Sequence, residues 1–188
     1  YSTDAINGSQ LYEAVRAVTA GASPDVYMHV NDGTSTQGAG NATTNLGKAN
    51  EKGGATGDSS IAIGKSATAQ GITSIAIGMN ASTDGTHGLN GISVGNNAKA
   101  LESNTIALGT DAESKGSSSI AIGHNSKTED SSSISIGYSS VANGMNSTIL
   151  GSNSSIGLYS NDSVILGPNS NIVGSPASPS IGSVLVGS

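Results

Sequence analysis

The sequence predicts an all-β solenoid, a parallel β-roll of about nine coils with roughly 14 residues in each. The pentapeptide Ser-Ile-Ala-Ile-Gly and its variants recur along the chain. Their closing glycines are Gly64, Gly78, Gly95, Gly109, Gly123, Gly137, Gly151, Gly167 and Gly187. Successive intervals are therefore 14, 17, 14, 14, 14, 14, 16 and 20 residues. A nearly fixed period in this range is typical of stacked repeats rather than of a globular domain.

Composition supports a thin sheet structure and excludes several function classes. The 188 residues include 27 Gly and no Trp, Phe or Cys, so a thick aromatic core, disulfides and thiol chemistry are excluded. The net charge of -6 disfavours a nucleic-acid groove or an anionic membrane surface as partner. No apolar run is long enough to span a membrane, and no signal peptide opens the chain at Tyr1, as expected of an excised piece.

The first 57 residues precede the regular repeats. A helix-start signal at Ser2 and the spacing of Leu11, Val15 and Val18 predict a short helix within residues 1–23. Such a helix is marginal alone, so we expect a coiled coil with identical copies, or else a cap on its own chain. Residues 24–57 read as a connector with a short strand near Met28 and degenerate first coils, and residues 58–188 form the regular solenoid.

The long strand of each coil alternates between two faces. One pair of columns is aliphatic, as in Ile61 and Ile63, and we place it inside the coil. The residue between them is small, as in Ala62, and then changes to Ile149, Ile165 and Leu185. We expect this middle column to face a neighbouring subunit and to make a tight trimer centre in the last coils.

A second strand and two turns complete the coil. Small residues at the third and fifth positions after the glycine, such as Ala67 and Ala69, alternate as in a strand. Before them stands a column of Asn, Asp and Ser, expected to close a tight turn through local side-chain bonds. Glycines such as Gly71 and Gly116 are expected to close the other turn at positive φ.

One column reports the stacking through its charges. Lys99, Glu113 and Lys127 occupy the same position in three successive coils, which places opposite charges one rung apart. Two buried Ile per coil do not offset the entropy of ordering about 14 residues, so self-association is expected to supply part of the stability.

Three consecutive segments resemble one protein family. Residues 2–11, Ser-Thr-Asp-Ala-Ile-Asn-Gly-Ser-Gln-Leu, resemble the neck of trimeric autotransporter adhesins. Residues 27–32, Tyr-Met-His-Val-Asn-Asp, resemble the HANS connector of that family, and the Ser-Ile-Ala-Ile-Gly coils resemble its YadA-like head. The chain departs from the family by lacking a membrane anchor, a signal peptide and a neck after Ser188, as a cut fragment would.

The resemblance implies a left-handed parallel β-roll assembled as an intertwined homotrimer on the outer membrane of a Gram-negative bacterium, at the cell surface. It also implies adhesion to a host extracellular matrix protein, a glycan, a cell surface or other bacteria, with a coiled-coil stalk and a role in virulence. No enzyme activity, cofactor or metal is implied. The resemblance also implies that the membrane is reached only through an anchor domain, which we expect outside this sequence.

Two insertions into the repeat are the candidate ligand-binding loops, because a solenoid extrudes extra residues from one face. The first extends over 85–90 and offers Thr86, His87 and Leu89. The second lies around 175–179 and offers Pro176 and Pro179. Tolerated loops without a ligand are the alternative, and the ligand itself is not predicted.

Isolated polar residues suggest no catalytic or metal site within one chain. His29, His87 and His124 stand in different settings, although a threefold axis could gather three copies of one of them around an ion. The acidic residues are scattered among columns, unlike a calcium ladder or a paired-carboxylate site.

Two other solenoid functions are alternatives to adhesion. A hexapeptide-type β-helix acyltransferase fits Ile63-Gly64-Lys65-Ser66-Ala67-Thr68 locally, but a period of 14 is not divisible by six. An ice-binding solenoid would need a regular Thr array, which the columns do not contain.

Overall fold

The computed structural model describes residues 28–30, 40–41, 46–47 and 54–187, and these contain strands and turns but no helix. The predicted helix and coiled coil of residues 1–23 lie outside the described residues. A ten-stranded sheet comprises β1 (Met28–Val30), β4 (Ile61–Ile63), β6 (Ile75–Ile77), β8 (Ile92–Val94), β10 (Ile106–Leu108), β12 (Ile120–Ile122), β14 (Ile134–Ile136), β16 (Thr148–Leu150), β18 (Val164–Leu166) and β20 (Val184–Val186). An eight-stranded sheet comprises β5 (Thr68–Ala69), β7 (Ser82–Thr83), β9 (Lys99–Ala100), β11 (Glu113–Ser114), β13 (Lys127–Thr128), β15 (Val141–Ala142), β17 (Ser155–Ile156) and β19 (Asn171–Ile172).

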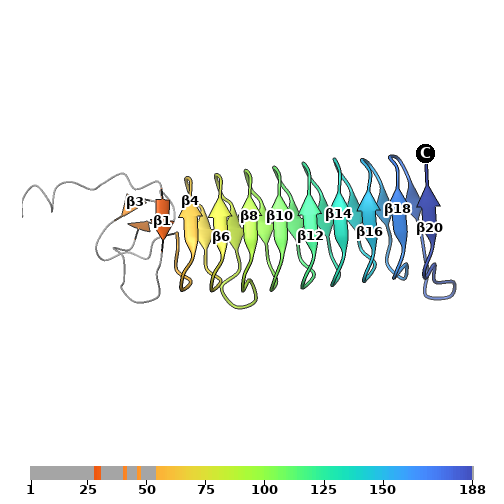
Figure 1. The fold of residues 1–188 in the computed structure, drawn as a ribbon, viewed down its shortest axis with the longest axis horizontal. Coiled ribbons are helices and arrows are strands. Elements are labelled where there is room, and N and C mark those ends of the chain that lie inside the picture. The colour runs from red at the N-terminus through yellow and green to blue at the C-terminus, as the bar shows by residue number, and fades with distance from the viewer. Residues whose placement is uncertain (1–27, 31–39, 42–45, 48–53, 188) are drawn as a thin grey trace, which may run out of the picture.

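The two sheets form the opposite walls of a rod, and the chain passes from one to the other in every coil (Figure 1). Strands pair in parallel with the equivalent strand of the next coil, as Ile120 pairs with Ile134. This confirms the predicted parallel β-solenoid and its two strands per coil. At the N-terminal end, β1 pairs antiparallel with β4, and β2 (Gly40–Asn41) pairs antiparallel with β3 (Leu46–Gly47).

The predicted facing of the long strand is wrong. Ala62 is fully buried inside the coil, whereas Ile61 and Ile63 are partly exposed on the outer surface. The serine before the strand explains this: the Ser60 hydroxyl donates a hydrogen bond of 2.6 Å to the carbonyl of Gly57 and is buried. Side chains two residues apart share a face, so the inward serine also turns the alanine inward and the isoleucines outward.

The interior changes along the rod. Alanines fill the first coils, and hydroxyl groups join the interior of the central coils. There, Ser114 lies 2.6 Å from Ser119, which in turn lies 2.9 Å from Thr128. The last coils are filled by Ala142, Ile149, Ile156, Ile165 and Ile172. Ile149 and Ile165 therefore belong to the core of one protomer and do not face a trimer centre, contrary to the prediction.

The turns are joined from coil to coil. The predicted Asn, Asp and Ser column lies in the left-handed region, with φ between 50° and 58° at Ser66, Asn80, Asn97, Asp111, Asn125, Ser139, Asn153 and Asn169. Several of these side chains bond to the next coil rather than locally: Asn80 Nδ2 donates to Asn97 Oδ1 at 3.0 Å. Short polar side chains tolerate this conformation best, which explains their selection.

Glycines at the other turn serve a different purpose from the one predicted. Gly71 and Gly116 are not among the residues with positive φ, which at this turn are Ser59, Thr73, Asn90, Asn104, Ser118, Ser132, Asn146, Asp162 and Gly182. A Cβ atom on Gly116 would lie 1.9 Å from the carbonyl oxygen of Asp130 in the next coil. Glycine is therefore required because neighbouring backbones approach closely.

Candidate functional site

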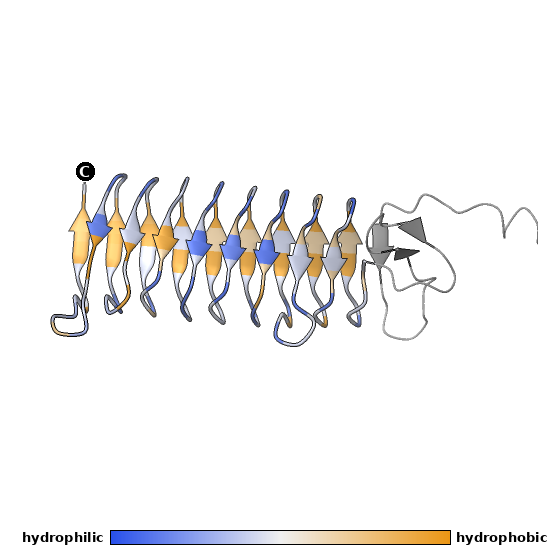
Figure 2. Cartoon of the chain, turned by 180° about the vertical axis from the view of Figure 1, so that it is seen from behind, coloured by the Kyte–Doolittle hydropathy of each residue, from blue (hydrophilic) through white to orange (hydrophobic). Residues whose placement is uncertain are grey.

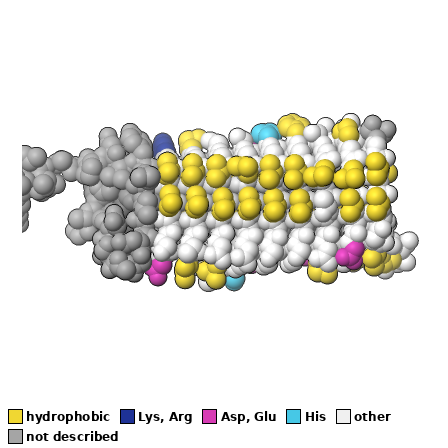
Figure 3. All heavy atoms as spheres, in the orientation of Figure 1, with side chains coloured by type: hydrophobic (Ala, Val, Ile, Leu, Met, Phe, Trp, Pro, Cys, Tyr) yellow, Lys and Arg dark blue, Asp and Glu magenta, His cyan; other side chains and the backbone are white. Residues whose placement is uncertain are grey.

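The outer face of the ten-stranded sheet is apolar along the rod. Figure 3 shows two rows of hydrophobic side chains that run across the successive coils. Ile61 begins one row and Ile63 the other, and the rows end at Val184 and Val186. Thr148 is the single polar residue in these two columns between 61 and 186. A continuous apolar face of this kind is typical of an interaction surface.

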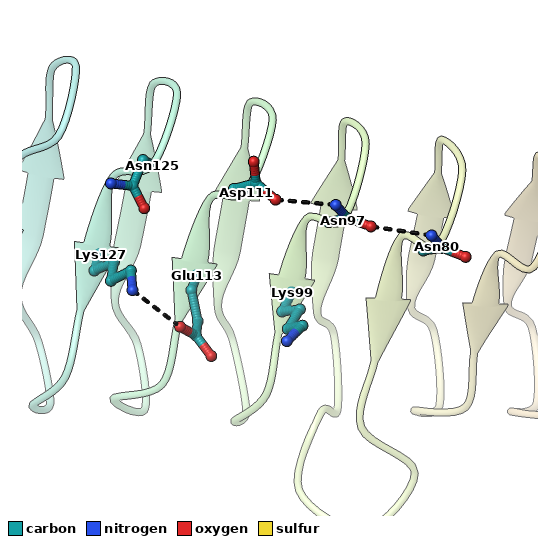
Figure 4. Close-up of a pocket in the computed structure, with 7 residues that line it drawn as sticks. All are labelled: Asn80, Asn97, Lys99, Asp111, Glu113, Asn125 and Lys127. Atoms are coloured by element: carbon teal, nitrogen blue, oxygen red, sulfur yellow. Dashed lines mark hydrogen bonds and ion pairs between the residues drawn. The ribbon is translucent and has the colours of Figure 1, made fainter.

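The outer face of the eight-stranded sheet is polar, as the blue short strands of the central coils show in Figure 2. A shallow hollow lies over these coils and is lined by Asn80, Asn97, Lys99, Asp111, Glu113, Asn125 and Lys127 (Figure 4). The amide ladder continues here, because Asn97 Nδ2 donates to Asp111 Oδ1 at 3.0 Å. The hollow presents amides and charges of both signs.

The charged column behaves as predicted. Glu113 pairs in register with Lys99 on one side and Lys127 on the other, and Lys127 Nζ lies 3.9 Å from Glu113 Oε2. Lys115, which sequence reasoning missed, lies 3.0 Å from Glu129 and 3.7 Å from Glu113. Hydrogen bonding to Glu129 raises the pKa of Lys115. Pairs this exposed contribute little to stability, so they mainly fix register.

The first candidate loop protrudes between β7 and β8 and is organised by Asp84. The Asp84 carboxylate accepts hydrogen bonds from the backbone amides of Thr86 at 2.7 Å and His87 at 3.0 Å. The amide of His87, followed by that of Thr86, lowers the pKa of Asp84, because these bonds stabilise the charged form. Thr86, His87 and Leu89 are exposed at the surface. Asp84 was not predicted, although an Asp three residues before a loop histidine is a recognisable turn signal.

The second candidate loop protrudes between β19 and β20, at the same edge of the rod as the first (Figure 1). Ser175 and Ser178 close it through two backbone hydrogen bonds of 3.0 and 3.1 Å. Pro176 and Pro179 are exposed. Several coils separate the two loops, so the structure places them on one edge without bringing them together.

A third insertion was missed. The 16-residue interval that ends at Gly167 contains an extra turn at Leu158 and Tyr159, which are 59% and 49% exposed. Tyr159 has φ 63°, which is unusual for a bulky residue. The interval length was the signal that could have identified it.

Histidines give no metal site in the part of the chain that is described. There, no three His, Asp or Glu side chains gather closely enough to hold an ion. His87 Nδ1 lies 3.8 Å from Asp84 Oδ1, and the His124 ring stacks on Tyr138. A site formed by three copies of one histidine stays a prediction.

No helix among the described residues is long and apolar enough to cross a membrane. The sequence model of the YadA head domain repeat, two copies in length, matches residues 55–81, 87–112, 114–140 and 131–154. These matches cover the coils from the first interior alanines to the switch toward an isoleucine core. The comparison with curated proteins found no match.

Proposed function

Because the chain belongs to the YadA head family, we propose that it is the head of a homotrimeric surface adhesin. The observation that carries this proposal is the apolar outer face of the ten-stranded sheet. Its two rows of aliphatic side chains point away from the core of the protomer and are partly exposed in a single chain. Three copies around an axis parallel to the rod would cover these rows.

The energetics favour assembly through this face. Full burial of one aliphatic side chain contributes about 1.5–3 kcal/mol, and each coil presents two of them to the same side. The alanine and serine core of the first and central coils supplies much less. A closed trimer is the arrangement that removes these rows from water while leaving the polar sheet and both loops exposed.

The mechanism is display without covalent chemistry. We place the head at the surface of a Gram-negative bacterium, where the polar sheet and the loop edge face a host matrix protein, a host cell or another bacterium. Each contact is weak, and three copies on one head bind together with higher avidity. The two strands per coil and the 14-residue period do not support the hexapeptide acyltransferase.

Sedimentation tests the assembly. We expect the chain to sediment at three times its protomer mass of 18.3 kDa. The double variant Ile106→Glu with Ile120→Glu should lose the trimer, because it places charges on the apolar face of two successive central coils. The matched control is Ser82→Glu with Ser155→Glu, on the outward side of the other sheet, and it should stay trimeric. A monomeric wild-type chain would refute the proposal.

A binding screen tests the adhesin function. The trimer and the Ile106→Glu, Ile120→Glu variant are compared on immobilised matrix proteins and on host cells, after circular dichroism shows that the variant is folded. Avidity predicts at least about 100-fold tighter binding by the trimer. Equal binding by both, or no binding by the trimer, would count against this mode of adhesion.

A further inference from the structure

One column of side chains lies at the turn after the long strand and has not been assigned a role. It contains the residue that follows each closing glycine: Lys65, Met79, Asn96, Thr110, His124, Tyr138, Ser152 and Pro168. Backbone hydrogen bonds fix the register of its second half. The amides of Ser139, Asn153 and Asn169 donate to the carbonyls of His124, Tyr138 and Ser152 at 2.9, 2.7 and 2.9 Å. Each residue of the column is thus one rung from the next.

Two rings stack in this column. The His124 and Tyr138 ring centroids are 5.3 Å apart, and the ring planes differ by 10°. This separation is close to the rung spacing of about 4.8 Å, so the rings follow one another along the rod. Tyr138 is nevertheless 55% exposed. His124 is the only ring stacked on it among the described residues, and the exposed fraction leaves part of the Tyr138 ring in contact with solvent.

Tyr138 borders a step in the column, where a small residue stands between two larger ones. The next residue is Ser152, which is small, and the one after it is the exposed Pro168. Two rungs separate Tyr138 from Pro168 by about 9.6 Å. Two carbon–carbon contacts of 3.5–4.0 Å need about 7–8 Å, so this spacing matches one ring that lies outward of the Ser152 side chain.

The polar residues on the turn beside the step are uncharged. The Ser152 hydroxyl makes no hydrogen bond to any described residue. Asn153 and Asn169 are exposed on the same turn, and only a long 3.4 Å hydrogen bond joins their amides. No Lys, Arg, Asp or Glu stands in the column from Met79 to Pro168. A phosphate or carboxylate would find no Lys or Arg in this part of the column.

We propose that this step is a stacking site for one pyranose ring of a neutral glycan. A pyranose presents C–H groups on one face and hydroxyls around its edge, which matches Tyr138 and Pro168 as walls and Ser152, Asn153 and Asn169 as hydrogen-bonding groups. The proposal rests on the adhesin function and names its ligand class. Three copies per head would raise the avidity of a weak single site.

Saturation-transfer NMR on the purified chain tests the site with methyl β-D-galactopyranoside and methyl β-D-glucopyranoside, and with p-cresol as an aromatic probe. We expect transfer to at least one glycoside. Tyr138→Ala should weaken it about tenfold by removing the ring. Ser152→Tyr should weaken it equally by filling the step, although Tyr138 is retained. Tyr138→Phe and Met79→Ala, the latter in the same column far from the step, should bind as the wild type does.

Thermal unfolding and sedimentation of each variant show whether fold and assembly are kept. The site is refuted if neither glycoside receives saturation from the wild type, if Ser152→Tyr binds unchanged, or if p-cresol binds and the glycosides do not. In each case an intact trimer that still adheres to cells leaves the adhesin function standing. Loss of the wild-type trimer or of all adhesion counts instead against the proposed function.

Discussion

The closing glycine of most repeats meets two separate requirements. Gly123 has φ +129°, a conformation that side chains rarely adopt, and a Cβ atom there would lie 2.3 Å from the carbonyl oxygen of Gly137. The first requirement is a backbone conformation that would strain other residues, and the second is room for the close approach of the next coil. The repeated glycine therefore reports both the turn and the stacking.

Comparing Gly123→Ala with Gly182→Ala separates these two requirements. Gly182 also has positive φ, +66°, but a Cβ atom there meets nothing within 4 Å. We expect Gly123→Ala to lower the free energy of unfolding by about 2–6 kcal/mol, from strain and overlap together. Gly182→Ala should cost about 1–2 kcal/mol, from strain alone. Urea unfolding followed by circular dichroism measures both, and equal losses would contradict the role given to coil contact.

The long strand shows how two adjacent side chains can have different roles. Ile149 is fully buried within the coil, and Leu150, the next residue, is 46% exposed on the apolar outer face. The first supports the fold of one protomer, whereas the second belongs to the surface that we assign to assembly.

Alanine substitutions at these two positions should therefore act differently. Ile149→Ala leaves a cavity among Ala142, Ile156 and Ile165, and should cost about 2–5 kcal/mol of protomer stability. Hydrogen exchange should detect this as faster exchange in the last coils. Leu150→Ala should leave the exchange within each coil nearly unchanged and shift the monomer–trimer equilibrium in sedimentation. If both variants lose protection equally, the division between core and interface is wrong.

The sequence predicted the strands better than it predicted their orientation. Alternation placed Ile61 and Ile63 on one face correctly, but alternation alone does not say which face is inside. Hydrophobicity favoured the isoleucines, while the decisive contact was the inward Ser60 hydroxyl on a turn carbonyl. A serine or threonine precedes the long strand in every repeat except the one that begins at Gly91, yet its hydrogen bond depends on a turn that only the folded coil creates.

The candidate binding features were also predicted only in part. The loops at Thr86 and Pro176 followed from interval lengths and do protrude from one edge. The His124–Tyr138 stack was not predicted, because the two residues are 14 positions apart and become neighbours only through the coil register. The coiled coil expected of residues 1–23 stays a prediction.

The rod as a unit consists of coils that contact mainly their neighbours. Deleting residues 110–123 removes one complete coil and joins Gly109 to His124, so every column continues in register. We expect this variant to fold, with a thermal midpoint within a few degrees of the wild type and a rod shorter by about 4.8 Å. Deleting 117–123 instead removes β12 and leaves β11 without its partner wall. That variant should unfold cooperatively at lower temperature, and similar melting of the two would contradict the repeat model.

The backbone ladders between successive coils also determine how the rod responds to tension. A pull along its length loads the bonds of one terminal coil at a time, because the backbone ladders of each described coil run to the coils beside it. Each coil of about 14 residues that peels away would release roughly 40 Å of chain. A load on the rod would thus be met by a series of small extensions, each of which dissipates part of it.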